Sequence, residues 1–211
     1  MRSFRTAFPH TFLPAFQRGV LAYSYRGLSC VKCPIDLAIY AKLLWDLRPG
    51  SVIEIGSYQG GSALWFADML TTYGLACPVV SVDLRAPETL IDPRIRFVTG
   101  DVNRLGDALN ETFLASLPRP WLVIEDSAHT YEATRSVIAF FVPRLFAGEV
   151  FVIEDGVIDD LGEAEVFNGG PNRAVRELLE THPHAFRIAT EYCDMFGINA
   201  TYSPNAYLAK L

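Results

Sequence analysis

Acidic side chains follow two apolar segments of the sequence, at the point where each segment ends. Residues 121–124 are all apolar, and Asp126 comes two positions later. Residues 150–153 are also apolar, and Glu154 and Asp155 follow at once. Such runs are typical of parallel strands covered on both faces, and ligands of open α/β sheets bind beyond the carboxyl ends of these strands. Because three carboxylates in one crevice repel each other unless a cation holds them, the sequence predicts a divalent-metal site.

A glycine-rich turn follows an earlier apolar strand and opens a helix. Residues 54–62 have the pattern E-x-G-x-x-x-G-x-S, which differs from the G-x-G-x-x-G that serves a pyrophosphate. Asp83, at the end of the next strand, can accept hydrogen bonds from two ribose hydroxyls, and Asp101 can meet an adenine amino group. Together these residues suggest S-adenosylmethionine as the ligand, and Glu54 would lie near its amino acid portion. The candidate cofactor-binding residues are Glu54, Gly56, Ser57, Tyr58, Gly60, Ser62, Asp83, Asp101 and Asp126.

Strands alternate with helices along the chain. We expect strands at 51–55, 79–83, 95–99, 121–124, 149–153, 186–192 and 206–210, and helices at 34–48, 63–70, 105–117, 129–145 and 171–180. This alternation predicts an α/β fold, a doubly wound and mainly parallel seven-stranded sheet in a single domain. We place that domain at residues 34–211.

Residues 1–33 differ from the rest of the chain because no acid occurs before Asp36. Phenylalanines recur there at every fourth position, but Pro9 and Pro14 should interrupt a helix. We expect an N-terminal arm that caps the domain or packs on another subunit; a transit peptide, which is also rich in arginine and poor in acids, is the alternative. Residues 156–170 are acidic and glycine-dotted, which suits either a mobile lid or an ordinary surface loop.

Composition excludes several classes of function. The net charge of −6 argues against nucleic-acid binding, which needs clustered Lys and Arg. No apolar run approaches the ~20 residues that span a bilayer, so no membrane partner is expected. The C-x-x-C at residues 30–33 has no second pair or nearby His to complete a zinc site. We interpret these thiols as incidental and expect a cytoplasmic protein.

The pattern resembles class I methyltransferases, and most closely the cephalosporin hydroxylase-like family, which includes macrolide-sugar O-methyltransferases. The resemblance covers about residues 34–211. It is carried by Pro34-Ile35-Asp36-Leu37-Ala38, Glu54-Ile55-Gly56-Ser57-Tyr58-Gln59-Gly60-Gly61-Ser62, Asp126-Ser127-Ala128-His129, Val152-Ile153-Glu154-Asp155 and Gly169-Gly170-Pro171. A non-haem iron oxygenase, which the family name suggests, would need two His and one carboxylate, and no H-x-D or H-x-E occurs in the sequence.

The resemblance implies specific roles at the predicted strand ends. Asp126, Glu154 and Asp155 would bind Mg²⁺, and His129 would be the general base that deprotonates a hydroxyl of a sugar or polyol. We place His129 one helical turn from Asp126, so that it points into the same crevice. The resemblance also implies a homo-oligomer.

Other interpretations stay open at this stage. Catechol-type methyltransferases have a similar plan, with Asp in place of the Glu and Lys in place of the His, and a non-catalytic S-adenosylmethionine-binding protein would need neither Asp126 nor His129. Asp83, Asp101 or Asp126 could each be a helix cap, and a lone His after a strand is commonly structural.

Overall fold

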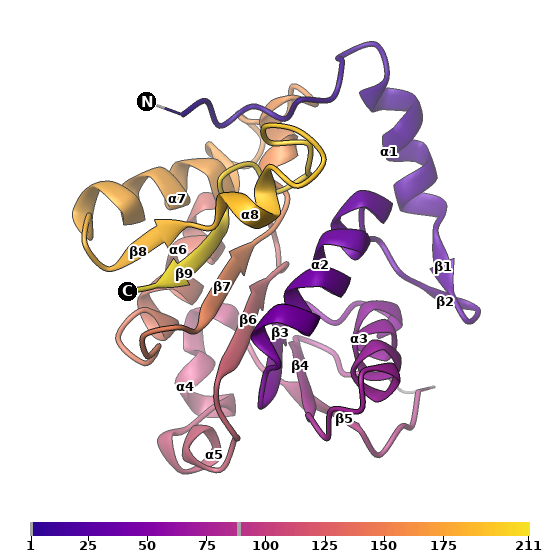
Figure 1. The fold of residues 1–211 in the computed structure, drawn as a ribbon, viewed down its shortest axis with the longest axis vertical. Helices are drawn as coiled ribbons and strands as arrows, with labels where there is room; N and C mark the ends of the chain where they lie inside the picture. Colours follow the sequence, from indigo (N-terminus) through magenta and orange to yellow (C-terminus); the bar gives the residue numbers. More distant parts are fainter. Residues whose placement is uncertain (1, 88–89) are drawn as a thin grey trace.

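The centre of the molecule is a seven-stranded sheet in the order β5-β4-β3-β6-β7-β9-β8 (Figure 1). The computed structural model describes residues 2–87 and 90–211. The strands of this sheet are β3 (Ser51–Ile55), β4 (Val79–Asp83), β5 (Ile95–Thr99), β6 (Trp121–Glu125), β7 (Val150–Ile153), β8 (Phe186–Ile188) and β9 (Tyr207–Lys210). The first five run parallel, and β9 pairs antiparallel with both β7 and β8. This confirms the doubly wound, mainly parallel sheet that the sequence predicts.

Helices cover both faces of the sheet, because successive strand residues point to opposite sides. The helices are α1 (Leu13–Ala22), α2 (Pro34–Leu47), α3 (Gly61–Thr72), η1 (Val102–Arg104), α4 (Leu105–Ala108), α5 (Glu111–Ala115), α6 (Tyr131–Phe141), η2 (Gly156–Asp159), α7 (Gly170–Thr181) and α8 (Thr190–Cys193). On one face, Val52 and Leu122 share a core with α2, α3 and α8. On the other, Ile53 and Val123 share a core with α4 to α7. The central strands β3, β6 and β7 are mostly apolar, because both of their faces are buried along the whole length of each strand.

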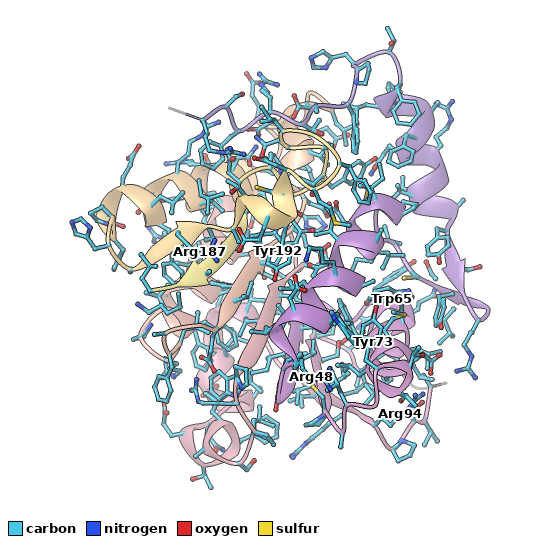
Figure 2. The ribbon with its side chains drawn as sticks, in the orientation of Figure 1. Arg48, Trp65, Tyr73, Arg94, Arg187 and Tyr192 are labelled. Carbon is cyan, nitrogen blue, oxygen red and sulfur yellow. The ribbon has the colours of Figure 1, made fainter. Side chains whose placement is uncertain are left out.

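Two expected elements are shorter than the sequence suggests. The strand expected at 186–192 ends at Ile188, where the chain turns into α8. This turn places Tyr192 beside α2 (Figure 2): its hydroxyl donates to Oδ2 of Asp46 at 3.3 Å, and its ring lies 6.3 Å from that of Tyr207. The helix expected at 105–117 is broken, because the side chain of Asn110 caps a new helix, α5.

The helix expected at 129–145 begins only at Tyr131. The side chain of Thr130 accepts the backbone N–H of Ala133 at 3.2 Å, which is the geometry of an N-cap. His129 therefore lies in the loop before the helix, and its expected position one helical turn from Asp126 is wrong. The backbone of this loop determines where the imidazole points.

The N-terminal segment folds against the domain. Pro14 does not interrupt a helix but lies in the first turn of α1, where no backbone N–H is needed from it. The rings of Phe8 and Phe16 lie 6.1 and 5.8 Å from that of Tyr202, which belongs to the C-terminal part of the chain. A short hairpin, β1 (Ser24–Tyr25) and β2 (Leu28–Ser29), follows α1 and contacts α3.

The order of the strands reverses direction at the middle of the sheet. The chain runs outward from β3 to β4 and β5 and then returns to β6, which pairs with the other side of β3. The loops after β3 and β6 therefore leave in opposite directions, and a crevice opens between them. Within residues 2–87 and 90–211, no helix has the length and apolar character needed to cross a membrane.

Candidate active site

A cleft of about 1100 Å³ lies beyond the carboxyl ends of the central strands. The predicted site residues that line it are Gly56, Ser57, Tyr58, Ser62, Asp83, Asp101, Asp126, His129 and Asp155. Two predicted cofactor-binding residues do not reach its surface. Glu54 is completely buried in β3, and Gly60 is the N-cap of α3, where a Cβ would lie 2.9 Å from the ring of Phe97. These two residues lie at the two ends of the glycine-rich turn, below the surface of the cleft.

The turn after β3 is held by contacts with both neighbouring strands. Oδ2 of Asp83 accepts the backbone N–H groups of Ser57 and Tyr58 at 2.8 and 2.9 Å. Gly56 has φ +110°, and a Cβ there would lie 1.9 Å from the carbonyl oxygen of Asp126. Only glycine allows this approach, since the obstacle is backbone of the adjacent strand. The end of β6 and the turn after β3 are therefore in direct contact.

Asp101 has two roles in the structure. Its Oδ1 accepts the backbone N–H of Asn103 at 2.8 Å, so it caps η1. It also lines the cleft, as does the turn after β3. The capping interpretation and the ligand-binding interpretation are therefore compatible at this residue.

Asp126, His129 and Asp155 come together at the floor of the cleft. Each offers one ligand atom, and these atoms lie within 4.8 Å of one another. Nδ1 of His129 lies 3.5 Å from Oδ2 of Asp155 and 3.9 Å from Oδ1 of Asp126. Asp126 is held by the sheet itself, because its N–H donates to the carbonyl of Ile55 at 2.8 Å. The group consists of two carboxylates and one imidazole.

Three residues of this cleft have left-handed backbone conformations. The φ angles are +44° at Tyr58, +56° at His129 and +60° at Asp155. Residues other than glycine seldom adopt this region because the Cβ is crowded there, and such strain persists only where the surrounding structure imposes it. The surrounding structure therefore fixes the backbone of these loops where they line the cleft.

Glu154 faces away from this group. Its Oε1 accepts from Nζ of Lys32 at 2.6 Å and from the hydroxyl of Tyr40 at 2.7 Å, and the residue is buried. Asp155 follows in a left-handed conformation after the end of β7, and its side chain turns to His129 while that of Glu154 is bound to Lys32 and Tyr40. Of the three acids that the sequence predicts as metal ligands, the structure brings Asp126 and Asp155 together with His129 and directs Glu154 to Lys32.

Lys32 is a site residue that sequence reasoning missed. Its side chain is 1% exposed, and its ammonium lies 2.5 Å from Oδ2 of Asp126, 2.6 Å from Oε1 of Glu154 and 3.7 Å from Oε1 of Glu54. It comes from the N-terminal segment and reaches acids at the ends of three strands. The only signal in the sequence is a single Lys in an apolar stretch just before the first helix of the domain.

Burial and charge shift the pKa values of the cluster. Burial raises the pKa of Asp126 to about 6, against the opposing effect of Lys32. Burial also raises the pKa of Asp155 and of Glu154. For His129, burial lowers the pKa, but Asp155 and Asp126 outweigh it, so the pKa is raised. Burial likewise opposes the charge of Lys32, but the carboxylates hold its pKa well above the ordinary value, so it stays an ammonium.

This set of residues fits a divalent cation. Four buried or half-buried carboxylates (Glu54, Asp126, Glu154 and Asp155) gather here, and the one ammonium of Lys32 lies within 4 Å of three of them, which leaves an excess of negative charge. Mg²⁺ prefers oxygen ligands and retains positions for water or substrate, and the donors of Asp126 and Asp155 face the open cleft.

The segment at 156–170 does not line the cleft. Oδ1 of Asp160 accepts from Arg5 at 3.2 Å, and the carbonyl of Phe167 accepts from the N–H of Tyr131 at 3.0 Å. The ring of Phe167 lies 6.2 Å from that of His129. These contacts hold the segment beside the active site, where it packs against the loop that carries His129.

Comparisons with known proteins agree with this geometry. The sequence model of the family described as rhamnosyl O-methyltransferase/CmcI matches residues 18–211. The rhamnosyl O-methyltransferase of Mycobacterium tuberculosis (strain H37Rv) is 28% identical over 195 residues, which cover 89% of this chain and 78% of that protein. A solved structure described as "cmcI-D160 Mg-SAM" matches with a TM-score of 0.69 and 26% identity, over 90% of this chain and 77% of that chain.

A more distant structure shares the fold alone. It is the MycE methyltransferase from the mycinamycin biosynthetic pathway, in complex with Mg, SAH and mycinamycin VI. It matches with a TM-score of 0.52 and 24% identity, over 69% of this chain and 41% of that chain. The chain therefore belongs to the rhamnosyl O-methyltransferase/CmcI family, which confirms both the resemblance seen in the sequence and the prediction of an O-methyltransferase.

Proposed function

We propose that this protein transfers a methyl group from S-adenosylmethionine to a hydroxyl of a sugar or polyol, in a reaction that requires Mg²⁺. One observation carries the proposal: Asp126, His129 and Asp155 meet within 4.8 Å at the floor of the cleft that the glycine-rich turn also lines. A metal-binding pair of carboxylates and a base thus lie beside a site suited to a nucleoside. The family to which the chain belongs supports the same reaction.

The two ends of the cleft would hold different groups. Ser57, Asp83 and Asp101 lie on the side of β3 to β5, where we place the adenosine portion of S-adenosylmethionine. Asp126 and Asp155 would hold Mg²⁺ on the side of β6 and β7. The CmcI structure described with Mg and SAM supports this pair of cofactors. When bound, S-adenosylmethionine supplies the electrophilic methyl group, and Mg²⁺ lowers the pKa of a nearby hydroxyl.

His129 would accept the proton of the acceptor hydroxyl. In the protein alone, Asp155 and Asp126 raise the pKa of His129 and favour its protonated form, which cannot act as a base. A dication among these carboxylates would oppose that rise, since its own charge dominates its surroundings. Lys32 cannot replace His129 as the base, because its ammonium is bonded to two carboxylates.

The names of relatives support a sugar as the acceptor. The Mycobacterium tuberculosis relative is called a rhamnosyl O-methyltransferase, which makes a sugar hydroxyl the first acceptor to test for this chain. The pair His129 and Glu154 also matches the sugar-type pattern, whereas catechol-type enzymes have Lys and Asp at those positions. A homo-oligomeric assembly and a cytoplasmic location remain predictions from the sequence.

A transfer assay tests the proposal. Purified protein is incubated with S-adenosylmethionine labelled at the methyl group, and with rhamnosides, other glycosides, polyols and catechols in turn. We expect label in a glycoside or polyol, loss of transfer in EDTA and recovery with added Mg²⁺. Transfer to catechols alone would establish the catechol-type alternative. Tight cofactor binding without transfer under any metal would establish a binding protein, and transfer that EDTA leaves unchanged would exclude the metal role.

A further inference from the structure

A buried cation from outside the expected domain lies at the centre of the acid cluster. The Nζ atom of Lys32 contacts Oδ2 of Asp126 and Oε1 of Glu154 at hydrogen-bond distance. Glu54, also completely buried, has its Oε1 3.7 Å from the same nitrogen and without any other partner in the described part of the chain. Three acids from the ends of β3, β6 and β7 thus converge on one ammonium group.

This arrangement differs from an ordinary buried ion pair. A single carboxylate would neutralise a lysine, but here one ammonium serves three, so the cluster keeps a negative excess even with Lys32 in place. Without the ammonium, Asp126 and Glu154 would lie close together in a largely buried region, and mutual repulsion would separate them. The close approach of these two strand ends therefore depends on a cation.

The same contact orients Asp126 toward the cleft. Its Oδ2 is bound by Lys32, so its Oδ1 is directed to the opposite side, where it lies 3.9 Å from Nδ1 of His129. Groups that hold one atom of a metal ligand commonly determine the direction of the other. No contact joins Lys32 to His129 or Asp155 in the described part of the chain, so it is linked by contact to the group of Asp126, His129 and Asp155 through Asp126.

We propose that Lys32 is a positioning residue of the metal site: it is the built-in counter-ion that keeps the acids of β3, β6 and β7 together when no metal is bound, and it directs Oδ1 of Asp126 toward the metal position. The role of directing Asp126 rests on the proposed Mg²⁺-dependent function, whereas the counter-ion role does not. Lys32 thereby links the N-terminal segment to the active site, and the site is incomplete without residues 1–33.

The experiment is a set of thermal melts of the full chain in EDTA and in excess Mg²⁺. Lys32→Met keeps the length of the side chain and removes its charge. We expect its melting temperature in EDTA to fall by roughly 6–20 °C, as for the loss of one partner of a buried ion pair. Lys42→Met is the matched control, because Lys42 is exposed and its ion pair is with Asp46 of its own helix. It should melt within about 2 °C of the wild type.

Charge is separated from packing by a double variant. Lys32→Met combined with Glu154→Gln removes one positive and one negative charge, so the net charge of the cluster returns to that of the wild type. We expect this protein to melt well above Lys32→Met in EDTA, or to fold where the single variant does not. Equal loss in both variants would show that Lys32 only fills space, and a wild-type melting temperature for Lys32→Met would overturn the proposal outright.

Mg²⁺ provides the second readout. Because Lys32→Met leaves Oδ1 of Asp126 without the contact that directs it, the melting temperature of this variant should rise on addition of Mg²⁺ by at least about 3 °C less than that of the wild type, the shift expected for a tenfold weaker site. An equal or larger rise would refute the role toward the metal. If the wild type itself shows no rise and no Mg²⁺-dependent transfer, the proposed function fails, while the comparison in EDTA still decides the counter-ion role.

Discussion

Gly56 is the position where a single methyl group should disturb both the fold and the active site. Its φ of +110° is strained for alanine, and the added Cβ would lie 1.9 Å from the carbonyl oxygen of Asp126. The left-handed conformation costs about 1–2 kcal/mol and overpacking roughly 1–3 kcal/mol more. The obstacle is backbone and cannot rotate away. For Gly56→Ala we therefore expect a fall in melting temperature of roughly 4–20 °C in a protein of this size.

The functional effect should exceed what the lost stability explains. To accommodate the methyl group, the chain at Asp126 must move away from the turn after β3, and the carboxylate of Asp126 moves with it. We therefore expect weaker binding of S-adenosylhomocysteine and of Mg²⁺ to the folded variant at 20 °C, measured by isothermal titration calorimetry.

A matched control separates the two contributions. Gly148 has a similar φ of +88°, but a Cβ there meets nothing within 4 Å. Gly148→Ala should therefore show only the conformational cost, about 1–2 kcal/mol, with normal ligand binding. If Gly56→Ala melts at the same temperature as Gly148→Ala and binds both ligands normally, the close contact between the turn and β6 does not have the role that we assign to it.

Three further predictions concern single side chains. His129→Ala should abolish methyl transfer while calorimetry still shows S-adenosylmethionine binding; full activity would remove His129 from the mechanism. Asp155→Asn should weaken Mg²⁺ binding at least about tenfold, since it removes a charged ligand, and unchanged affinity would exclude Asp155 from the site. Burial raises the pKa of Asp36 to about 8 from 3.8, so the folded state keeps a proton that the unfolded state loses, and wild-type stability falls as pH rises between these values. Relative to the wild type, the free energy of unfolding of Asp36→Asn, measured by urea titration, should therefore increase by about 1.4 kcal/mol per pH unit between pH 5 and 7. A difference in unfolding free energy that does not change with pH would contradict the raised pKa.

Local patterns in the sequence were sufficient for the fold and for one half of the cleft. The apolar runs at β3, β6 and β7 predict buried parallel strands because both faces of such strands are covered, which requires apolar residues at every position. The glycine-rich turn and Asp83 could also be recognised, because a turn and the end of a strand each depend on only a few consecutive residues. Helix ends were less predictable: with Thr130 as its N-cap, the helix expected from residue 129 begins two residues later, at Tyr131, and His129 lies in the loop before it.

The sequence by itself determined which residues are strands, which turn approaches a ligand and which acids stand at the strand ends. Only the tertiary structure decided how those acids are used. Lys32 meets Asp126 and Glu154 across 94 and 122 positions of sequence, and Glu154 and Asp155, although adjacent, face different partners. The physical reason is that parallel strands are joined by long crossovers, so contacts at their ends depend on the register and layering of the sheet rather than on spacing along the chain.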